Sequence, residues 1–97
     1  MLQFNYKNHE MTVVVSGYCC NNNLYVGLED EEGELWDITV NLDQKLPSNQ
    51  AYIDTNNFPD ATMIINNHGL GKFTGKTAQS GFSTYPLYEF NMERLKS

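Results

Sequence analysis

Two stretches of alternating apolar residues, separated by a short acidic segment, constrain the fold of this chain more than any other feature. Apolar side chains occupy every second position in both: Leu24, Val26 and Leu28 in the first, and Trp36, Ile38, Val40 and Leu42 in the second. Alternation with a period of two is typical of β-strands that bury one face. The sequence therefore predicts two adjacent antiparallel strands joined by a hairpin loop.

The length of this loop follows from the need to turn both apolar faces toward one core. A slip of one residue would expose a whole face, so we expect the three-residue loop Glu31-Glu32-Gly33. Gly33 then occupies the position of such a loop that requires a left-handed backbone. The resulting cross-strand pairs are Leu24 with Val40, Val26 with Ile38, Leu28 with Trp36, and Asp30 with Glu34.

Similar patterns assign the rest of the chain to short elements. Further strands are expected in residues 2–6, 11–18, 50–54 and 85–92, with a turn at 19–23, a connection at 43–49 and a polar, glycine-rich loop at 71–81. The predicted fold class is α+β: an antiparallel β-meander sheet of about six strands with one short helix before the last strand.

The single helix is predicted between residues 59 and 69. Pro59 suits a first helical position, Asp60 complements the positive end of the helix dipole, and Gly69 suits the stop. Residues recurring at helical spacing are Phe58, Ala61, Ile65 and His68. Because His68 lies near the negative end of this helix, we expect its charged form to be favoured.

Length and composition indicate one soluble domain, residues 1–97, in a reducing cytoplasm. The chain can build one core, and its 40% hydrophobic share is ordinary for a globular protein. No apolar run has the length of a transmembrane helix, and no signal peptide is recognisable. Cys19 and Cys20 are adjacent and cannot staple the fold. The net charge of −6 disfavours nucleic acid and anionic membranes and favours basic protein surfaces.

The acidic segment is the leading candidate for a binding site. Six carboxylates fall within nine residues: Glu29, Asp30, Glu31, Glu32, Glu34 and Asp37. One interpretation is a solvated turn, in which water screens the repulsion. Another is a rigid acidic prong that binds Arg and Lys side chains in the basic groove of a partner. Weak binding of a divalent cation is a third, although the spacing does not match an EF-hand loop.

The other chemistry-bearing residues predict no active site, no metal and no cofactor. His9, His68, Cys19 and Cys20 are the metal candidates, but they lack a metal-ligand spacing, and the thiols are expected to be partly buried beside a turn. Residues 71–77 resemble a phosphate-binding loop with one residue too few between its glycines. The aromatic residues of the strands are expected to pack in the core or anchor a protein interface: Tyr6, Tyr18, Tyr25, Trp36, Tyr52, Tyr85 and Tyr88.

A series of short motifs in the second half resembles an uncharacterised protein family. In chain order they are Asn41-Leu42-Asp43, Leu46-Pro47, Ala51-Tyr52-Ile53-Asp54-Thr55-Asn56-Asn57, Pro59, Gly69-Leu70-Gly71, Thr74-Gly75, Ser80-Gly81-Phe82 and Thr84-Tyr85-Pro86-Leu87-Tyr88-Glu89-Phe90. The resemblance covers residues 35–92. The family comprises small acidic proteins encoded largely on plasmids, integrative elements and phages of Gram-positive bacteria. It carries no agreed activity, so no functional residue is carried over from it.

The context implied by this resemblance leads to two functional hypotheses. Small acidic proteins of mobile elements include anti-CRISPR proteins, several of which occupy the DNA-binding groove of Cas9. By this analogy we expect a non-enzymatic inhibitor, a DNA mimic whose residues 29–37 block the nucleic-acid groove of a Cas9-like nuclease, with the loop at 71–81 beside it. The alternative is an accessory protein of a mobile element, with no nuclease target, that acts as a monomer or as a homodimer joined through a sheet edge.

Overall fold

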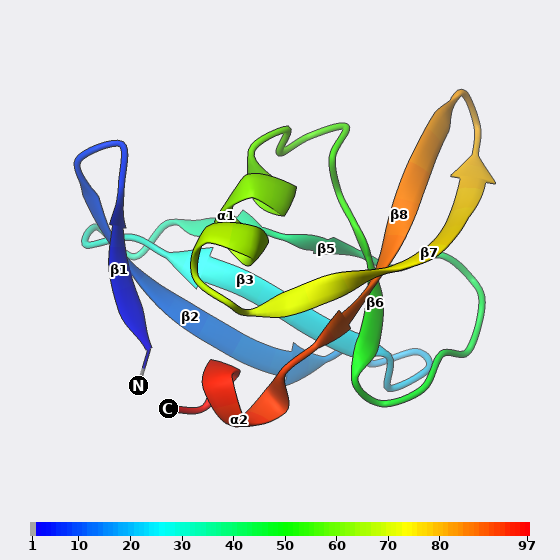
Figure 1. Cartoon of the computed structure of the whole chain (residues 1–97), viewed down its shortest axis with the longest axis horizontal. Helices are drawn as coiled ribbons and strands as arrows, with labels where there is room; N and C mark the ends of the chain where they lie inside the picture. The colour runs from blue at the N-terminus through cyan, green and yellow to red at the C-terminus, as the bar shows by residue number, and fades with distance from the viewer. Residues whose placement is uncertain (1) are drawn as a thin grey trace.

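Two four-stranded antiparallel sheets and two short helices make up the fold (Figure 1). The computed structural model describes residues 2–97. The first sheet contains, in spatial order, β1 (Gln3–Tyr6), β2 (His9–Gly17), β3 (Leu24–Glu29) and β4 (Leu35–Asp37). The second contains β5 (Thr39–Val40), β6 (Gln50–Ile53), β8 (Ser83–Phe90) and β7 (Gly71–Ser80). The helices are α1 (Ala61–Asn67), which precedes β7 and β8, and α2 (Met92–Leu95).

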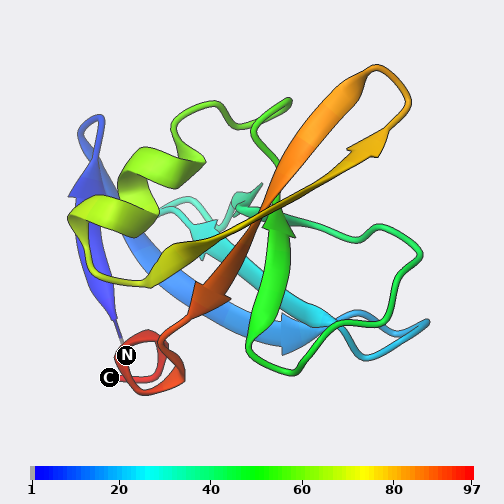
Figure 2. The same cartoon turned by 45° about the vertical axis from the view of Figure 1, so that its right-hand side comes forward.

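The α+β class is confirmed, since 48% of the residues lie in strands and 11% in helices. One apolar core draws on both sheets and both helices; among its most deeply buried side chains are Met11, Val26, Leu28, Ile38, Ile53, Ile64, Ile65 and Leu95. A smaller cluster of Tyr52, Tyr85 and Leu87 covers the other face of the second sheet. The hairpin of β7 and β8 projects away from the rest of the chain (Figure 2).

The β3–β4 hairpin has the register that the alternation predicts. Leu28 lies opposite Trp36, the N–H of Asp30 donates to the carbonyl of Glu34, and the N–H of Ile38 donates to the carbonyl of Val26. Gly33 has a φ of +84°, a left-handed conformation that residues with a Cβ adopt rarely. The three-residue loop and the pairs around it are therefore confirmed.

At Ile38 the chain passes from the first sheet to the second. The N–H of Ile38 still bonds to Val26 of β3, but its carbonyl accepts the N–H of Asp54, which follows β6, at 2.9 Å. The N–H of Val26 thereby loses the main-chain acceptor expected in an antiparallel ladder. The side-chain hydroxyl of Thr39 replaces that carbonyl and accepts the N–H of Val26 at 3.1 Å.

This change of sheet overturns one expected pair, that of Leu24 with Val40. Thr39 faces the core with 2% of its surface exposed. Val40 and Leu42 instead pack against the smaller cluster on the far face of the second sheet. The prediction is wrong because alternation describes which side a residue faces along a strand but does not show where the main chain leaves one sheet for another.

The prediction of a loop at residues 71–81 is also wrong, because most of this segment is strand β7. β7 pairs with β8 along its length, with an irregularity between Phe73 and Thr77, where Gly75 has a φ of +89°. β7 is an edge strand, and most of its side chains are exposed. An exposed strand needs no apolar face, so its sequence lacks the alternation that identifies buried strands. The residues that resemble a phosphate-binding loop thus lie on a strand.

Helix α1 begins later than predicted and ends as predicted. Pro59 precedes the helix, Asp60 is its N-cap, and the first helical residue is Ala61. Gly69 follows the C-cap with a φ of +64°, which confirms the expected stop. The side chain of Asp60 makes no capping hydrogen bond to the helix. Its carboxylate is therefore available for contacts outside α1.

His68, the C-cap of α1, does not favour its charged form as expected. Its ring stacks on Phe4 of β1, with 3.9 Å between the ring centroids. Burial, together with the positive charge of Arg94, lowers the pKa of His68 below its usual value. The expectation considered only the helix end, whereas packing against an aromatic ring removes water from the imidazole and so disfavours its charged form.

Candidate functional site

The six carboxylates of the acidic segment lie on the β3–β4 hairpin, which we call the acidic hairpin (residues 29–37). Five of them are exposed: Glu29, Glu31, Glu32, Glu34 and Asp37. The sixth, Asp30, turns inward and has only 7% of its surface exposed. The structure thus exposes five of the six predicted contact residues to solvent, whereas Asp30 has a role inside the hairpin.

Asp30 organises the hairpin loop. One carboxylate oxygen accepts the backbone N–H groups of Glu32 and Glu34, both at 2.9 Å, and the other accepts Nε1–H of Trp36 at 3.2 Å. Burial acts to raise the pKa of Asp30, but these hydrogen bonds outweigh it and the pKa lies below its usual value. The charge of Asp30 is therefore satisfied internally and holds the loop in one conformation.

Glu31 ties the tip of the hairpin to the start of β2. Its carboxylate accepts from Nδ1 of His9 at 2.8 Å and from the backbone N–H of Glu10 at 2.8 Å. The hydrogen bond with His9 lowers the pKa of Glu31 and raises the pKa of His9. Although exposed, Glu31 is thus a tether of the hairpin as well as a surface charge.

Asp37 is oriented by a tyrosine from the neighbouring strand. The hydroxyl of Tyr25 donates to Oδ1 of Asp37 at 2.6 Å, and burial followed by this hydrogen bond raises the pKa of Tyr25. The tyrosine ring crosses Gly27, where an added Cβ would overlap the hydroxyl oxygen of Tyr25. Gly27 is therefore needed so that Tyr25 can reach Asp37, and Oδ2 of Asp37 is left to accept a further donor.

The remaining carboxylates of the acidic hairpin are uncommitted. Within residues 2–97, the side chains of Glu29, Glu32 and Glu34 form no hydrogen bond or ion pair. Water therefore solvates them in the free protein. These three side chains can pair with an incoming cation without breaking an internal contact.

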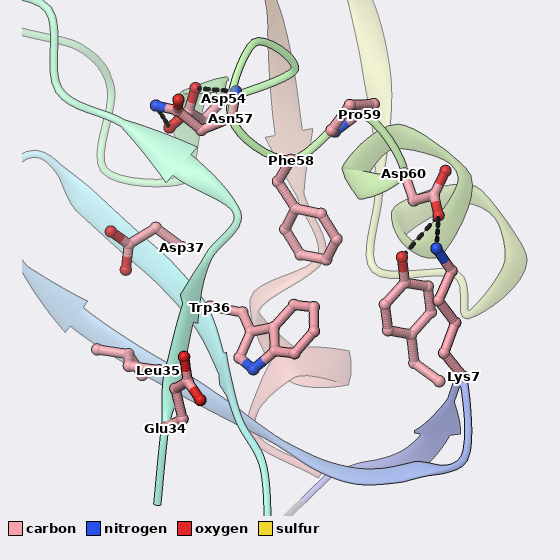
Figure 3. A pocket seen from close by; sticks show the side chains of 11 residues that line it. Lys7, Glu34, Leu35, Trp36, Asp37, Asp54, Asn57, Phe58, Pro59 and Asp60 are labelled. Atoms are coloured by element: carbon pink, nitrogen blue, oxygen red, sulfur yellow. Dashed lines mark hydrogen bonds and ion pairs between the residues drawn. The ribbon is translucent and has the colours of Figure 1, made fainter.

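An open pocket of about 540 Å³ adjoins the acidic hairpin, and we call it the aromatic pocket (Figure 3). It lies where β4, the turn after β1 and the segment leading into α1 come together. Figure 3 shows Trp36 and Phe58 in the middle of the pocket. Glu34 and Asp37 stand on one side of them, and Asp60 stands with its ion-pair partner Lys7 on the other.

Three aromatic rings form the floor of the aromatic pocket. The ring centroids of Tyr6, Trp36 and Phe58 lie 5.8–6.0 Å apart, and the ring planes are inclined by 55–87°. Tyr6 and Phe58 are buried, whereas Trp36 is half-buried. Inclined aromatic contacts of this kind are stabilising. The floor is therefore rigid and apolar, and the accessible part of it belongs mainly to Trp36.

Asp60 holds a cation at the rim of the aromatic pocket. It accepts the hydroxyl of Tyr6 at 2.6 Å and pairs with the ammonium of Lys7, whose Nζ lies 3.5 Å from Oδ2. The hydrogen bond from Tyr6, followed by the charge of Lys7, keeps the pKa of Asp60 below its usual value despite partial burial. The same ammonium lies 5.5 Å from the centroid of the Tyr6 ring. The carboxylate and the aromatic face thus bind one positive charge together.

Sequence reasoning found one side of the pocket and missed the other. Glu34, Trp36 and Asp37 belong to the predicted hairpin, whereas the sequence indicates Asp60 only as part of a helix start and gives Lys7 no role. The contact between Tyr6 and Asp60 spans 54 positions and carries no local signal. In the structure Lys7 occupies a left-handed turn position, with a φ of +48°, that Asn or Gly adopts more readily.

Apart from His9, which contacts Glu31 and Trp36, the other candidates are separate from this site. Cys19 and Cys20 lie in the expected turn, but both are free and exposed, so the expected partial burial is wrong. Within the described part of the chain, residues 2–97, no three His, Cys, Asp or Glu side chains are grouped so that they could hold a metal ion. In the same residues no helix has both the length and the apolar character that crossing a membrane requires.

Comparison with known proteins identifies one family model. A model described as "Domain of unknown function (DUF4313)" matches residues 12–97. The match is wider than the resemblance over residues 35–92 and includes the whole acidic hairpin. No curated protein and no solved structure matches the chain.

Proposed function

Because this chain belongs to the DUF4313 family, a domain of unknown function, we propose a role from its surface: a non-enzymatic module that binds a basic surface of a partner protein through the acidic hairpin. The observation that carries this proposal is that the hairpin carboxylates form two groups, one bonded within the protein and one free. Asp30 and Glu31 hold the loop in place, whereas Glu29, Glu32 and Glu34 are free to contact a partner. A rigid loop loses little conformational freedom on binding, so its charges are used efficiently.

The distribution of charge along the chain supports a basic partner. Residues 1–60 contain ten acidic and two basic side chains, whereas residues 61–97 contain two acidic and four basic ones. The negative charge is thus concentrated in the part that carries the acidic hairpin and the aromatic pocket. A surface of one sign attracts an opposite surface over several ångströms and raises the association rate.

The specific partner that we propose is the nucleic-acid groove of a Cas9-like nuclease. Such a groove presents Arg and Lys side chains to a phosphate backbone and to guanine. The exposed carboxylates of the acidic hairpin would replace the phosphates, and the protein would act as an inhibitor of DNA binding. This target comes from the resemblance to acidic proteins of mobile elements, and the acidic hairpin is compatible with it.

The test compares two double charge reversals that change the net charge equally. Glu32→Lys with Glu34→Lys alters the uncommitted hairpin charges, and Asp43→Lys with Glu93→Lys alters exposed carboxylates elsewhere. Glu31 is left intact because its reversal would also break the tether to His9. Affinity capture from a host lysate at low and moderate salt identifies candidate partners, and guided DNA cleavage by the purified nuclease measures inhibition.

We expect the hairpin reversal to weaken binding by about tenfold or more, and the control reversal to change it much less. Capture of a basic nuclease that is inhibited by the native chain supports the specific target. If both double variants lose binding equally, only net charge matters and the acidic hairpin is not the contact surface. If the native chain captures other basic proteins and inhibits no nuclease, the Cas9-like target is wrong.

A second candidate function, a self-associating accessory protein, is favoured by the exposed edge of the second sheet. β7 lies at this edge and carries Phe73, which is 50% exposed, and the turn after it carries Phe82, which is fully exposed. Unpaired strand edges and exposed aromatic side chains are common in interfaces. Size-exclusion chromatography with light scattering tests this role. A dimer that Phe73→Ser converts to a monomer would support it, and a monomer at high concentration would exclude it.

A further inference from the structure

We propose that the aromatic pocket receives the side chain of an arginine from the partner protein, with the guanidinium stacked on Trp36 and paired with the carboxylates of the rim. This inference deepens the proposed function and rests on it, because it assigns one anchoring residue to the basic partner. The acidic hairpin would attract the partner, and the aromatic pocket would position it. Interfaces commonly depend on a few such anchors seated in pockets.

The shape of the aromatic pocket fits a long side chain that is apolar along its stem and charged at its tip. Its volume of about 540 Å³ is within the range of small ligand sites. The apolar stem of such a side chain can pack on the half-buried Trp36 at the floor and on Leu35 at the edge, which is 51% exposed. The rim carries carboxylates from two directions, Glu34 just before β4 and Asp60 before α1. An apolar floor with an anionic rim is complementary to this kind of side chain.

The chain itself supplies evidence that a cation is stable in this place. The ammonium of Lys7 already lies between Asp60 and the face of Tyr6, at 3.5 Å from the carboxylate and 5.5 Å from the ring centroid. It occupies only the Asp60 side of the pocket, and the side chain of Glu34 has no partner in residues 2–97. The side chain of Lys7 is 69% exposed and can move aside at little cost. Lys7 therefore fills the part of the pocket beside Asp60, and an arginine of the partner can displace it.

Arginine fits the free side better than lysine or a metal ion. Its guanidinium is planar, so it stacks on an indole face while its N–H groups point outward in the ring plane toward carboxylates. Glu34, two residues before Trp36 and free of internal contacts, provides acceptor oxygens for that fork. Lysine has a compact, strongly hydrated charge and gains less from stacking. A divalent cation requires oxygen ligands around it, whereas the floor here is made of carbon.

The test uses Trp36, the single tryptophan of the chain, as a reporter inside the pocket. N-acetyl-arginine amide is added at millimolar concentrations and the tryptophan emission is recorded. The probe N-acetyl-citrulline amide has the same shape without the charge and serves as the matched ligand control. We expect a saturable change in emission with the arginine probe and binding about tenfold weaker with the citrulline probe. The lysine analogue is expected to bind less tightly than the arginine probe.

Three variants assign the response to the proposed groups. Glu34→Gln should weaken the arginine probe by about threefold, whereas Asp43→Asn should leave it unchanged. Lys7→Asn keeps a residue suited to the left-handed turn and removes the internal competitor. It should strengthen binding of the arginine probe about twofold, since Asp60 is then free. Near-ultraviolet circular dichroism of each variant verifies that the packing around Trp36 is retained.

The outcomes separate this inference from the function on which it rests. Equal responses to the arginine and citrulline probes, or weaker arginine binding in Lys7→Asn, would overturn the arginine site. If that result accompanies capture that still depends on Glu32 and Glu34, the acidic hairpin remains the binding surface and only the anchor is wrong. If the arginine site is verified but capture does not depend on the hairpin, the proposed function fails instead.

Discussion

Replacing Thr39 by valine removes the side-chain hydroxyl that accepts the N–H of Val26 where the chain passes from the first sheet to the second. Valine has nearly the shape of threonine, but it leaves the N–H of Val26 without an acceptor at a residue with 0% exposure. An orphaned buried donor costs about 1–3 kcal/mol. Loss of the hydrogen bond to the Tyr18 hydroxyl, at 2.9 Å, adds about 1 kcal/mol, and the extra methyl group recovers about 0.8 kcal/mol. We therefore expect Thr39→Val to be destabilised by about 2 kcal/mol.

The matched control is Thr39→Ser, which keeps the hydroxyl and loses a buried methyl group at a cost of about 1 kcal/mol. For a domain of this size, each kcal/mol lowers the melting temperature by about 4–5 °C. Urea unfolding followed by Trp36 fluorescence, and thermal unfolding, measure both variants. If Thr39→Val is as stable as Thr39→Ser, or more stable than the native chain, then the hydroxyl does not replace the missing carbonyl and the reasoning is refuted.

Three further predictions concern the hairpin and the projecting turn. The pKa of His9 is raised in the folded state, so this group stabilises the fold at pH values below 6.5, and the stabilisation is lost as the pH rises through the raised pKa. The pKa of Glu31 is lowered, so this group stabilises the fold at pH values above 4.5, and the stabilisation is lost as the pH falls through the lowered pKa. The midpoint of urea unfolding should therefore decrease between pH 6 and pH 9, and His9→Gln should reduce this decrease; an unchanged decrease would contradict the tether. Gly27→Ala should displace the tyrosine that binds Asp37 and cost about 1 kcal/mol in urea unfolding, because this hydrogen bond is lost, whereas a neutral effect would show that the ring has another path. Phe82→Ser should change the melting temperature little, since a fully exposed side chain contributes within about 0.5 kcal/mol, and a large decrease would reveal an unrecognised contact.

Local patterns in the sequence are sufficient to predict the acidic hairpin. Alternation on both sides of a single glycine determines its loop length and its register, because any other register exposes an apolar face. The stop of α1 at Gly69 is predictable for a similar reason, since one residue type suits one backbone conformation. Strand β7 could not be recognised, because an exposed edge strand needs no apolar face and its glycines and polar residues are typical of loops.

The passage between the sheets and most of the aromatic pocket depend on contacts that no local pattern encodes. Thr39 lies in the alternating stretch of the sequence, and it faces the core because the chain joins the second sheet there, where the carbonyl of Ile38 accepts the N–H of Asp54. The pocket likewise requires that Asp60 contact Tyr6 and Lys7, and Tyr6 lies 54 positions before it in the sequence. The charge cluster can be recognised from the number of acidic residues in the segment. The role of Asp30 cannot, because the sequence does not distinguish a buried aspartate from an exposed one.

The most direct test of the proposed binding surface is a titration of the isotope-labelled chain with an arginine-rich decapeptide, followed by amide chemical shifts. We predict that the largest shifts occur at Glu32, Glu34 and Phe58 and at the indole N–H of Trp36, with saturation that weakens as salt is added. Shifts of equal size at Asp43 and Glu93 would contradict the account, because the peptide would then be binding to acidic side chains wherever they occur.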